Sequence, residues 1–159
     1  MYKTAKILTG IAMVLLVFLL VVMFGVYVRA SLVEFSAIPA TQDPVLATEL
    51  IATAQRDDMA SDLYKHPTSS DLNNYKLITI KVQASNIGIL SAEWLQLRVA
   101  SVVGDVALFP GSPTDLRPLG GSETITATLL TESQTDETSR EIWLQYYVFG
   151  RKMQIAIRG

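Results

Sequence analysis

Residues 141–157 read EIWLQYYVFGRKMQIAI and predict two strands that turn back on each other. In EIWLQYYV and in MQIAI, large apolar residues alternate with other residues, which is the period-two pattern of a strand with one buried face. The two runs are separated by Phe149-Gly150-Arg151-Lys152, in which the glycine supplies the turn. The sequence therefore predicts a C-terminal β-hairpin.

The same alternation recurs in the part of the chain before this hairpin. Between Tyr75 and Ser85, for example, Ile78, Ile80 and Val82 alternate with polar residues. Turns rich in glycine and proline separate the candidate strands, which we place at residues 75–85, 93–100, 106–109 and 123–129. Several short strands with such turns in about a hundred residues are typical of a sandwich. We therefore predict a mainly β fold, an antiparallel β-sandwich.

Three segments carry a resemblance to a known class of domain. They are the turn Asn86-Ile87-Gly88, the stretch PLGGSETITATL at 118–129 and the final hairpin. In these segments the chain resembles small immunoglobulin-like modules of bacterial membrane-anchored surface proteins, including those of the FxLYD and LEA type. The resemblance covers residues 75–159 and implies an immunoglobulin-like sandwich, but a shared fold assigns no activity.

The N-terminal part of the chain has a different character. Residues 7–28 read ILTGIAMVLLVFLLVVMFGVYV and contain no charged residue. As a helix this run would be about 33 Å long, which matches the bilayer core. A cleaved signal peptide is the alternative, because Val28-Arg29-Ala30 resembles a cleavage site, but the apolar region of a signal peptide spans only about 7–15 residues. The length favours a transmembrane α-helix that is retained as an anchor.

The charges around this run predict its orientation in a cell membrane. Lys3 and Lys6 precede it, whereas the residues that follow Arg29 include Glu34 and Asp43. Because positive charge favours the cytoplasmic side, we expect a cytoplasmic N-terminus and an extracytoplasmic C-terminal domain. The bilayer lipids are then the first partner of the chain.

Pro39 and Asp43-Pro44 divide the segment after the anchor. Pro39 interrupts any continuation of the membrane helix, and Asp43-Pro44 is a helix start with a capping residue and a proline in the first turn. We expect a short amphipathic helix from there to about residue 58 or residue 63. The predicted parts are residues 1–30 with the anchor, a connector with this helix over 31–70, and the β-sandwich over 71–159.

Composition and motifs argue against several functions. Thirteen Lys and Arg residues against fifteen Asp and Glu residues give a net charge of -2, so we expect no nucleic-acid binding. The chain has no cysteine and one histidine, His66, in a predicted surface loop. Asp57, Asp58 and Asp62 form the densest acidic group, but they lack the loop of an EF-hand, and we interpret them as a solvated helix end. We expect no enzyme, no cofactor and no metal site.

Aromatic residues give the best candidate for an interaction site. If the larger apolar residues of 142–148 face the core, the intervening aromatic residues project from the opposite face. The candidate residues are Trp143, Tyr147, Phe149 and Trp94. An exposed aromatic face favours a binding patch, whereas a cover formed by the helix after Asp43, or by the connector, would make these residues structural.

Three functional hypotheses follow from these features. The leading one is a non-catalytic protein-interaction or accessory subunit of a membrane or cell-surface complex, with a protein partner. A pilin-like filament subunit is the first alternative, although MYKTAK lacks the expected processing site and glutamate. The second alternative is a carrier that encloses an apolar ligand in a cavity within the sandwich.

Overall fold

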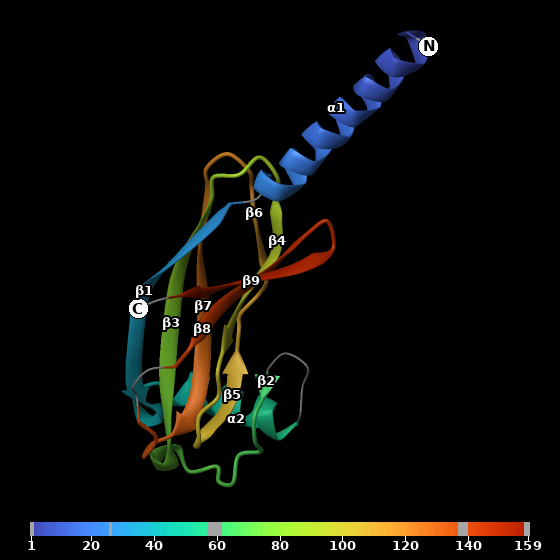
Figure 1. Cartoon of the computed structure of the whole chain (residues 1–159). Coiled ribbons are helices and arrows are strands. Elements are labelled where there is room, and N and C mark those ends of the chain that lie inside the picture. Colours follow the sequence, from blue (N-terminus) through green and yellow to red (C-terminus); the bar gives the residue numbers. More distant parts are fainter. Residues whose placement is uncertain (1, 26, 57–61, 137–139, 158–159) are drawn as a thin grey trace.

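The computed structural model describes residues 2–25, 27–56, 62–136 and 140–157, and within the N-terminal helix it describes side chains from residue 5 to residue 21. The described chain forms two antiparallel sheets, of five and four strands, and two α-helices (Figure 1). This architecture confirms the predicted mainly β class. The N-terminal helix α1 (Tyr2–Phe24) leaves one end of the two-sheet domain, and α2 (Pro44–Gln55) lies toward the other end.

The first sheet has the strand order β1-β3-β7-β5-β2 and the second has the order β6-β4-β8-β9. The strands of the first sheet are β1 (Val28–Pro39), β3 (Tyr75–Asn86), β7 (Gly121–Glu132), β5 (Asp105–Phe109) and β2 (Asp62–Leu63). The strands of the second are β6 (Thr114–Leu116), β4 (Ala92–Val99), β8 (Ile142–Val148) and β9 (Arg151–Ile157). Every strand predicted from alternation is present, within two or three residues at its ends.

The two sheets pack face to face because the alternating apolar residues of each point toward the other. Ile78 and Ile80 from β3 belong to the same buried cluster as Leu95 from β4 and Leu144 from β8, and all four are 0% exposed. Burial of this kind is the main contribution to the stability of a small domain without disulfides. The carrier hypothesis, which requires a cavity between the sheets, stays a prediction.

β1 occupies a segment that we expected to be a connector. Val28–Pro39 pairs with β3 along its whole length, from Val28 opposite Asn86 to Pro39 opposite Lys76. A register shift between Leu32 and Glu34 changes which residues point inward, so the alternation in this strand changes phase. That change conceals the strand from a search for strict period-two patterns, and the sheet begins well before residue 71.

The N-terminal helix is also shorter at its C-terminal end than the apolar run. α1 ends at Phe24, whereas Tyr27 accepts a hydrogen bond from the backbone N–H of Ile87 at 3.1 Å and Val28 begins β1. The last apolar residues of the run therefore belong to the β domain. Judged on its described residues, the structure contains no helix that meets both the length and the hydropathy of a membrane span.

The second helix begins where the sequence predicts. The Asp43 carboxylate accepts a hydrogen bond from the N–H of Leu46 at 3.1 Å, and Pro44 is the first helical residue. α2 ends at Gln55, so the longer of the two predicted extents is wrong, since Leu63 lies in β2. Asp57 and Asp58 lie outside the described residues.

α2 packs on one end of the outer face of the five-stranded sheet. Its buried residues are Ala47, Leu50, Ile51 and Ala54, whereas Val45 in its first turn is 79% exposed. The four buried residues of α2 share a second apolar cluster with Leu77 of β3 and Leu130 of β7, whose side chains point away from the inter-sheet core. The 3-10 turns η1 (Ala40–Gln42) and η2 (Leu72–Asn74) border this cluster.

Candidate functional site

The outer face of the four-stranded sheet carries two of the predicted interaction residues on one strand. Trp143 lies on β8 between Arg98 of β4 and Ala156 of β9, and Tyr147 lies on the same strand between Glu93 and Lys152. Both aromatic side chains are half-buried. Because α2 packs on the other sheet, it does not cover this face, and the structural alternative in which that helix buries the aromatic residues is wrong.

A row of glutamines separates the two aromatic residues. Gln96, Gln145 and Gln154 lie opposite one another on β4, β8 and β9. The side-chain amide of Gln145 donates to the hydroxyl of Tyr147 at 3.5 Å, a long hydrogen bond. The face therefore combines aromatic area with amide donors and acceptors, a composition found in protein interfaces.

Phe149 and Trp94, the other two predicted interaction residues, do not lie in the regular part of this face. Phe149 and Gly150 form a two-residue turn at the tip of the hairpin, with φ of 49° and 71°, and β9 begins at Arg151, so the predicted four-residue connection is shorter. Trp94 lies at an irregularity of β4, with φ of 53°, and its N–H donates to the Asp115 carboxylate at 2.8 Å. Both aromatic side chains are exposed and lie toward the end of the domain from which α1 departs.

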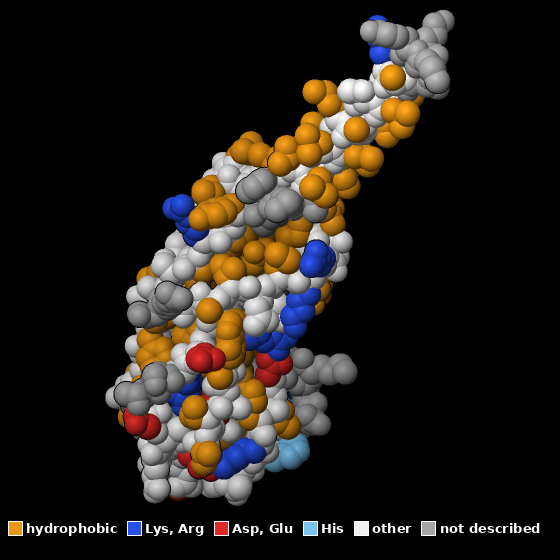
Figure 2. Space-filling model, in the orientation of Figure 1, with side chains coloured by type: hydrophobic (Ala, Val, Ile, Leu, Met, Phe, Trp, Pro, Cys, Tyr) orange, Lys and Arg blue, Asp and Glu red, His pale blue; other side chains and the backbone are white. Residues whose placement is uncertain are grey.

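Four further exposed apolar residues lie at that end, and no pattern of strands predicted them. They are Tyr27, Ile87, Ile89 and Leu119. Figure 2 shows hydrophobic side chains gathered along α1 and on the adjoining end of the domain. A large residue directly before a turn glycine, as in Leu119-Gly120, is the sequence signal that points to Leu119; the predicted residue Phe149 has the same signal in Phe149-Gly150.

A buried ion pair fastens the loop before β8 to β5. Nη2 of Arg140 donates to Oδ1 of Asp105 at 2.7 Å and Nε donates to Oδ2 at 3.2 Å, and both side chains are 0% exposed. Oδ2 also accepts from the N–H of Val102 at 2.9 Å. The two-point geometry and the extra donor satisfy the carboxylate, which is the condition under which a buried charge is tolerated.

Asp62 and Tyr64, which lie near this region, have structural partners. Asp62, one of the three predicted acidic residues, forms an ion pair with Arg98. The Tyr64 hydroxyl donates to the carbonyl of Val99 at 3.0 Å. Burial raises the pKa of Tyr64 to about 12, and the charges of Asp62 and Asp105 add to this shift. These contacts attach β2 and its following loop to the second sheet.

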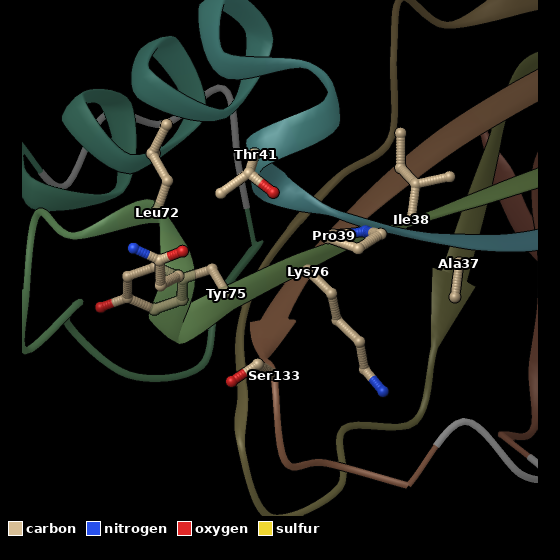
Figure 3. A pocket seen from close by; sticks show the side chains of 9 residues that line it. Ala37, Ile38, Pro39, Thr41, Leu72, Tyr75, Lys76 and Ser133 are labelled. Carbon is tan, nitrogen blue, oxygen red and sulfur yellow. The ribbon is translucent and has the colours of Figure 1, made fainter.

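A hollow of about 240 Å³ lies at the end of the domain away from α1 (Figure 3). It opens between the ends of β1 and β3 and the two 3-10 turns. The amine of Lys76 donates to the carbonyl of Thr135, and the Tyr75 hydroxyl donates to the carbonyl of Ser69 at 3.0 Å. These polar groups already have partners within the fold, and we assign no ligand to this hollow.

His66 is exposed in a loop, as predicted. Among the described residues, no group of three or more His, Asp or Glu side chains is placed to hold a metal ion. No protein-family model matches this chain, and no curated protein shows significant sequence similarity to it.

Proposed function

We propose that the protein is a single-pass membrane protein with a cytoplasmic N-terminus and an extracytoplasmic domain. The observation that carries this proposal is the exposure of α1, in which the large apolar side chains of residues 7–20 range from 45% exposed at Leu20 to 70% at Val14. A helix that is apolar on all sides requires an apolar environment, because water does not solvate such a surface favourably. In this proposal the membrane span is the whole of α1, Tyr2–Phe24, and Lys3 and Lys6 lie at its cytoplasmic end.

We propose further that the domain is immunoglobulin-like and serves as a non-catalytic interaction or accessory subunit. Its partner surface is the outer face of the four-stranded sheet, here called the glutamine-aromatic face and formed by Trp143, Tyr147, Gln145 and Gln96. The support is that α2 packs on the other sheet and that Trp143, Tyr147 and Gln96 are half-buried, although Gln145 itself is only 6% exposed. Half-buried aromatic rings held by neighbouring strands lose little side-chain entropy on binding.

The absence of cysteine from the sequence allows a clean topology experiment. Single substitutions Thr4→Cys and Thr126→Cys place one thiol before the apolar run and one on the exposed surface of β7. In intact spheroplasts, a membrane-impermeant maleimide should label Thr126→Cys, and it should label Thr4→Cys only after the membrane is opened. Equal labelling of both sites before opening would overturn the topology.

The partner surface is tested by crosslinking in the native membrane. A photoreactive amino acid at position 147 should give a discrete crosslinked product, and the same amino acid at position 126 on the other sheet should not. The double variant Trp143→Ser and Tyr147→Ser should weaken the isolated complex by about 2 kcal/mol or more. If the variant loses thermal stability but binds normally per folded molecule, these residues are structural and the interface is wrong.

A further inference from the structure

The end of the domain next to α1 gathers loops from separate parts of the chain. The N–H of Leu90 donates to the carbonyl of Gly25 at 2.7 Å, which attaches the loop after β3 to the end of α1. The N–H of Leu119 donates to the carbonyl of Gly88 at 2.8 Å, which attaches the turn before β7 to the same loop. Phe149 at the hairpin tip lines an open hollow of about 180 Å³ together with Ile89 from this loop.

These loops present a set of exposed apolar side chains, which we call the apolar rim. Its members are Tyr27, Ile87, Ile89, Trp94, Leu119 and Phe149, each more than half exposed. Figure 1 shows the loops after β3 and before β7, and the tip of the β8–β9 hairpin, at the end from which α1 departs. Isolated exposed apolar residues are ordinary, but a group of six at one end of a domain indicates a surface that is covered in use.

The backbone at three rim residues is unfavourable for the side chains present. Trp94, Leu119 and Phe149 have φ of 53°, 58° and 49°, and they are the non-glycine residues with positive φ among those described. This left-handed region suits glycine or asparagine, and a bulky side chain there is strained. Leu119 and Phe149 are each 77% exposed, so packing within the chain does not compensate for that strain. Strained residues of this kind are concentrated at functional sites.

We propose that the apolar rim is seated in the lipid head-group layer, so that the domain rests on the membrane that α1 crosses. This inference depends on the proposed membrane anchor. If α1 spans the bilayer, the bond between Gly25 and Leu90 holds the rim at the level where the helix leaves the hydrocarbon. Aromatic rings favour that level because they combine an apolar body with a polar edge.

Three cationic groups near the rim suit the same location, whereas the exposed carboxylates of Glu93 and Asp115 beside Trp94 oppose it. The guanidinium of Arg29 lies 5.2 Å from the centre of the Tyr27 ring. Arg117 and Arg151 flank the turns that carry Leu119 and Phe149, and their side chains are exposed. These cations can contact lipid phosphates while the apolar side chains enter the region below. The rim would therefore fix the orientation of the domain and leave the glutamine-aromatic face directed along or away from the membrane.

The two tryptophans of the chain provide a matched test. Trp143→Phe leaves Trp94 of the rim as the single fluorophore, and Trp94→Phe leaves Trp143 of the glutamine-aromatic face. The full chain is reconstituted into phosphatidylcholine vesicles with bromine on shallow acyl-chain carbons. Trp94 emission should lose most of its intensity and shift to shorter wavelength, while Trp143 emission should be quenched by aqueous iodide and not by the brominated lipid.

Flotation of the same vesicles separates the two proposals. If the chain floats with the vesicles but iodide quenches Trp94 as strongly as Trp143, the rim proposal is overturned and the anchor stands. Shielding of Trp94 from both lipid and iodide would mean that protein covers the rim, which also overturns the proposal. If the reconstituted chain does not float, the anchor itself is wrong and the rim proposal falls with it.

Discussion

The backbone N–H of Leu90 donates a hydrogen bond to the carbonyl oxygen of Gly25 across 2.7 Å, and this bond joins the apolar helix to the β domain. The space around residue 25 admits only glycine. A Cβ atom on Gly25 would lie 2.2 Å from the carbonyl oxygen of Val21 and 2.4 Å from Cδ1 of Leu90. Because one of these neighbours is backbone, a side chain cannot be accommodated without moving the end of the helix.

Gly25→Ala should therefore weaken the junction. We expect faster amide hydrogen exchange at Leu90, since the substituted residue displaces the acceptor of its hydrogen bond. Peptide-resolved exchange on the full chain in detergent measures this rate. Gly10→Ala is the matched control, because a Cβ there meets no atom within 4 Å. Unchanged protection of Leu90 in Gly25→Ala would show that the junction does not depend on the close approach.

The buried pair of Asp105 and Arg140 predicts a large effect of a single substitution. Asp105→Ala leaves the Arg140 guanidinium buried without its carboxylate, which commonly costs about 3–5 kcal/mol. The control is Glu34→Ala, which breaks the ion pair with Lys81, a pair whose side chains are both 40% exposed. An exposed pair contributes at most about 1 kcal/mol. Denaturant unfolding of both variants measures the difference, and equal losses would contradict the structural role of the buried pair.

Tyr64 predicts a pH dependence at the alkaline end. Its pKa is raised from 10.0 to about 12, so the folded state favours the neutral phenol. The stabilising contribution is complete below the unfolded pKa of about 10 and is lost as pH rises toward the folded value. Tyr64→Phe should remove this part of the alkaline loss, and at neutral pH it should cost about 1 kcal/mol for the hydrogen bond to Val99. Unfolding midpoints of Tyr64→Phe and the parent chain, measured across this pH range, test the prediction. If the midpoints of both chains fall equally with rising pH, the prediction is wrong.

The strained hairpin tip predicts a stabilising substitution. Phe149→Asn should raise the free energy of unfolding by about 1 kcal/mol, because asparagine followed by glycine suits a turn with two positive φ angles. Gly150→Ala should act in the opposite direction, since its φ is 71° although a Cβ there has open space. Thermal unfolding of the two variants in detergent shows whether each substitution stabilises or destabilises the domain. Destabilisation by Phe149→Asn would mean that the aromatic ring makes a contact that offsets its backbone strain.

Local signals predicted the parts of this fold that depend on neighbours in sequence. Alternation predicted β3, β4, β7 and the hairpin, and Asp43-Pro44 predicted the start of α2. β1 was not predicted because the shift between Leu32 and Glu34 interrupts its alternation. The ion pair of Asp105 and Arg140 joins residues 35 positions apart, and no local pattern in the sequence indicates such a contact.

The candidate site was predicted in part for a similar reason. Strand alternation placed Trp143 and Tyr147 on one face, as the structure has them. It did not separate Trp94 and Phe149 from that face, because an irregularity in β4 and a shorter turn alter the positions of those two residues. The rim as a whole depends on loops that meet only in the folded chain.

The central claim, that α1 anchors the domain in a membrane, is tested most directly by alkaline carbonate extraction of membranes that contain the full chain. The parent chain should remain in the membrane pellet. Leu15→Arg with Leu16→Arg should move the protein to the soluble fraction, since each charge at the centre of a span costs about 2.5–3.5 kcal/mol. Ser112→Arg with Thr126→Arg adds the same charge to exposed positions of the domain and should leave the protein in the pellet. Release of the parent chain into the soluble fraction would contradict the account.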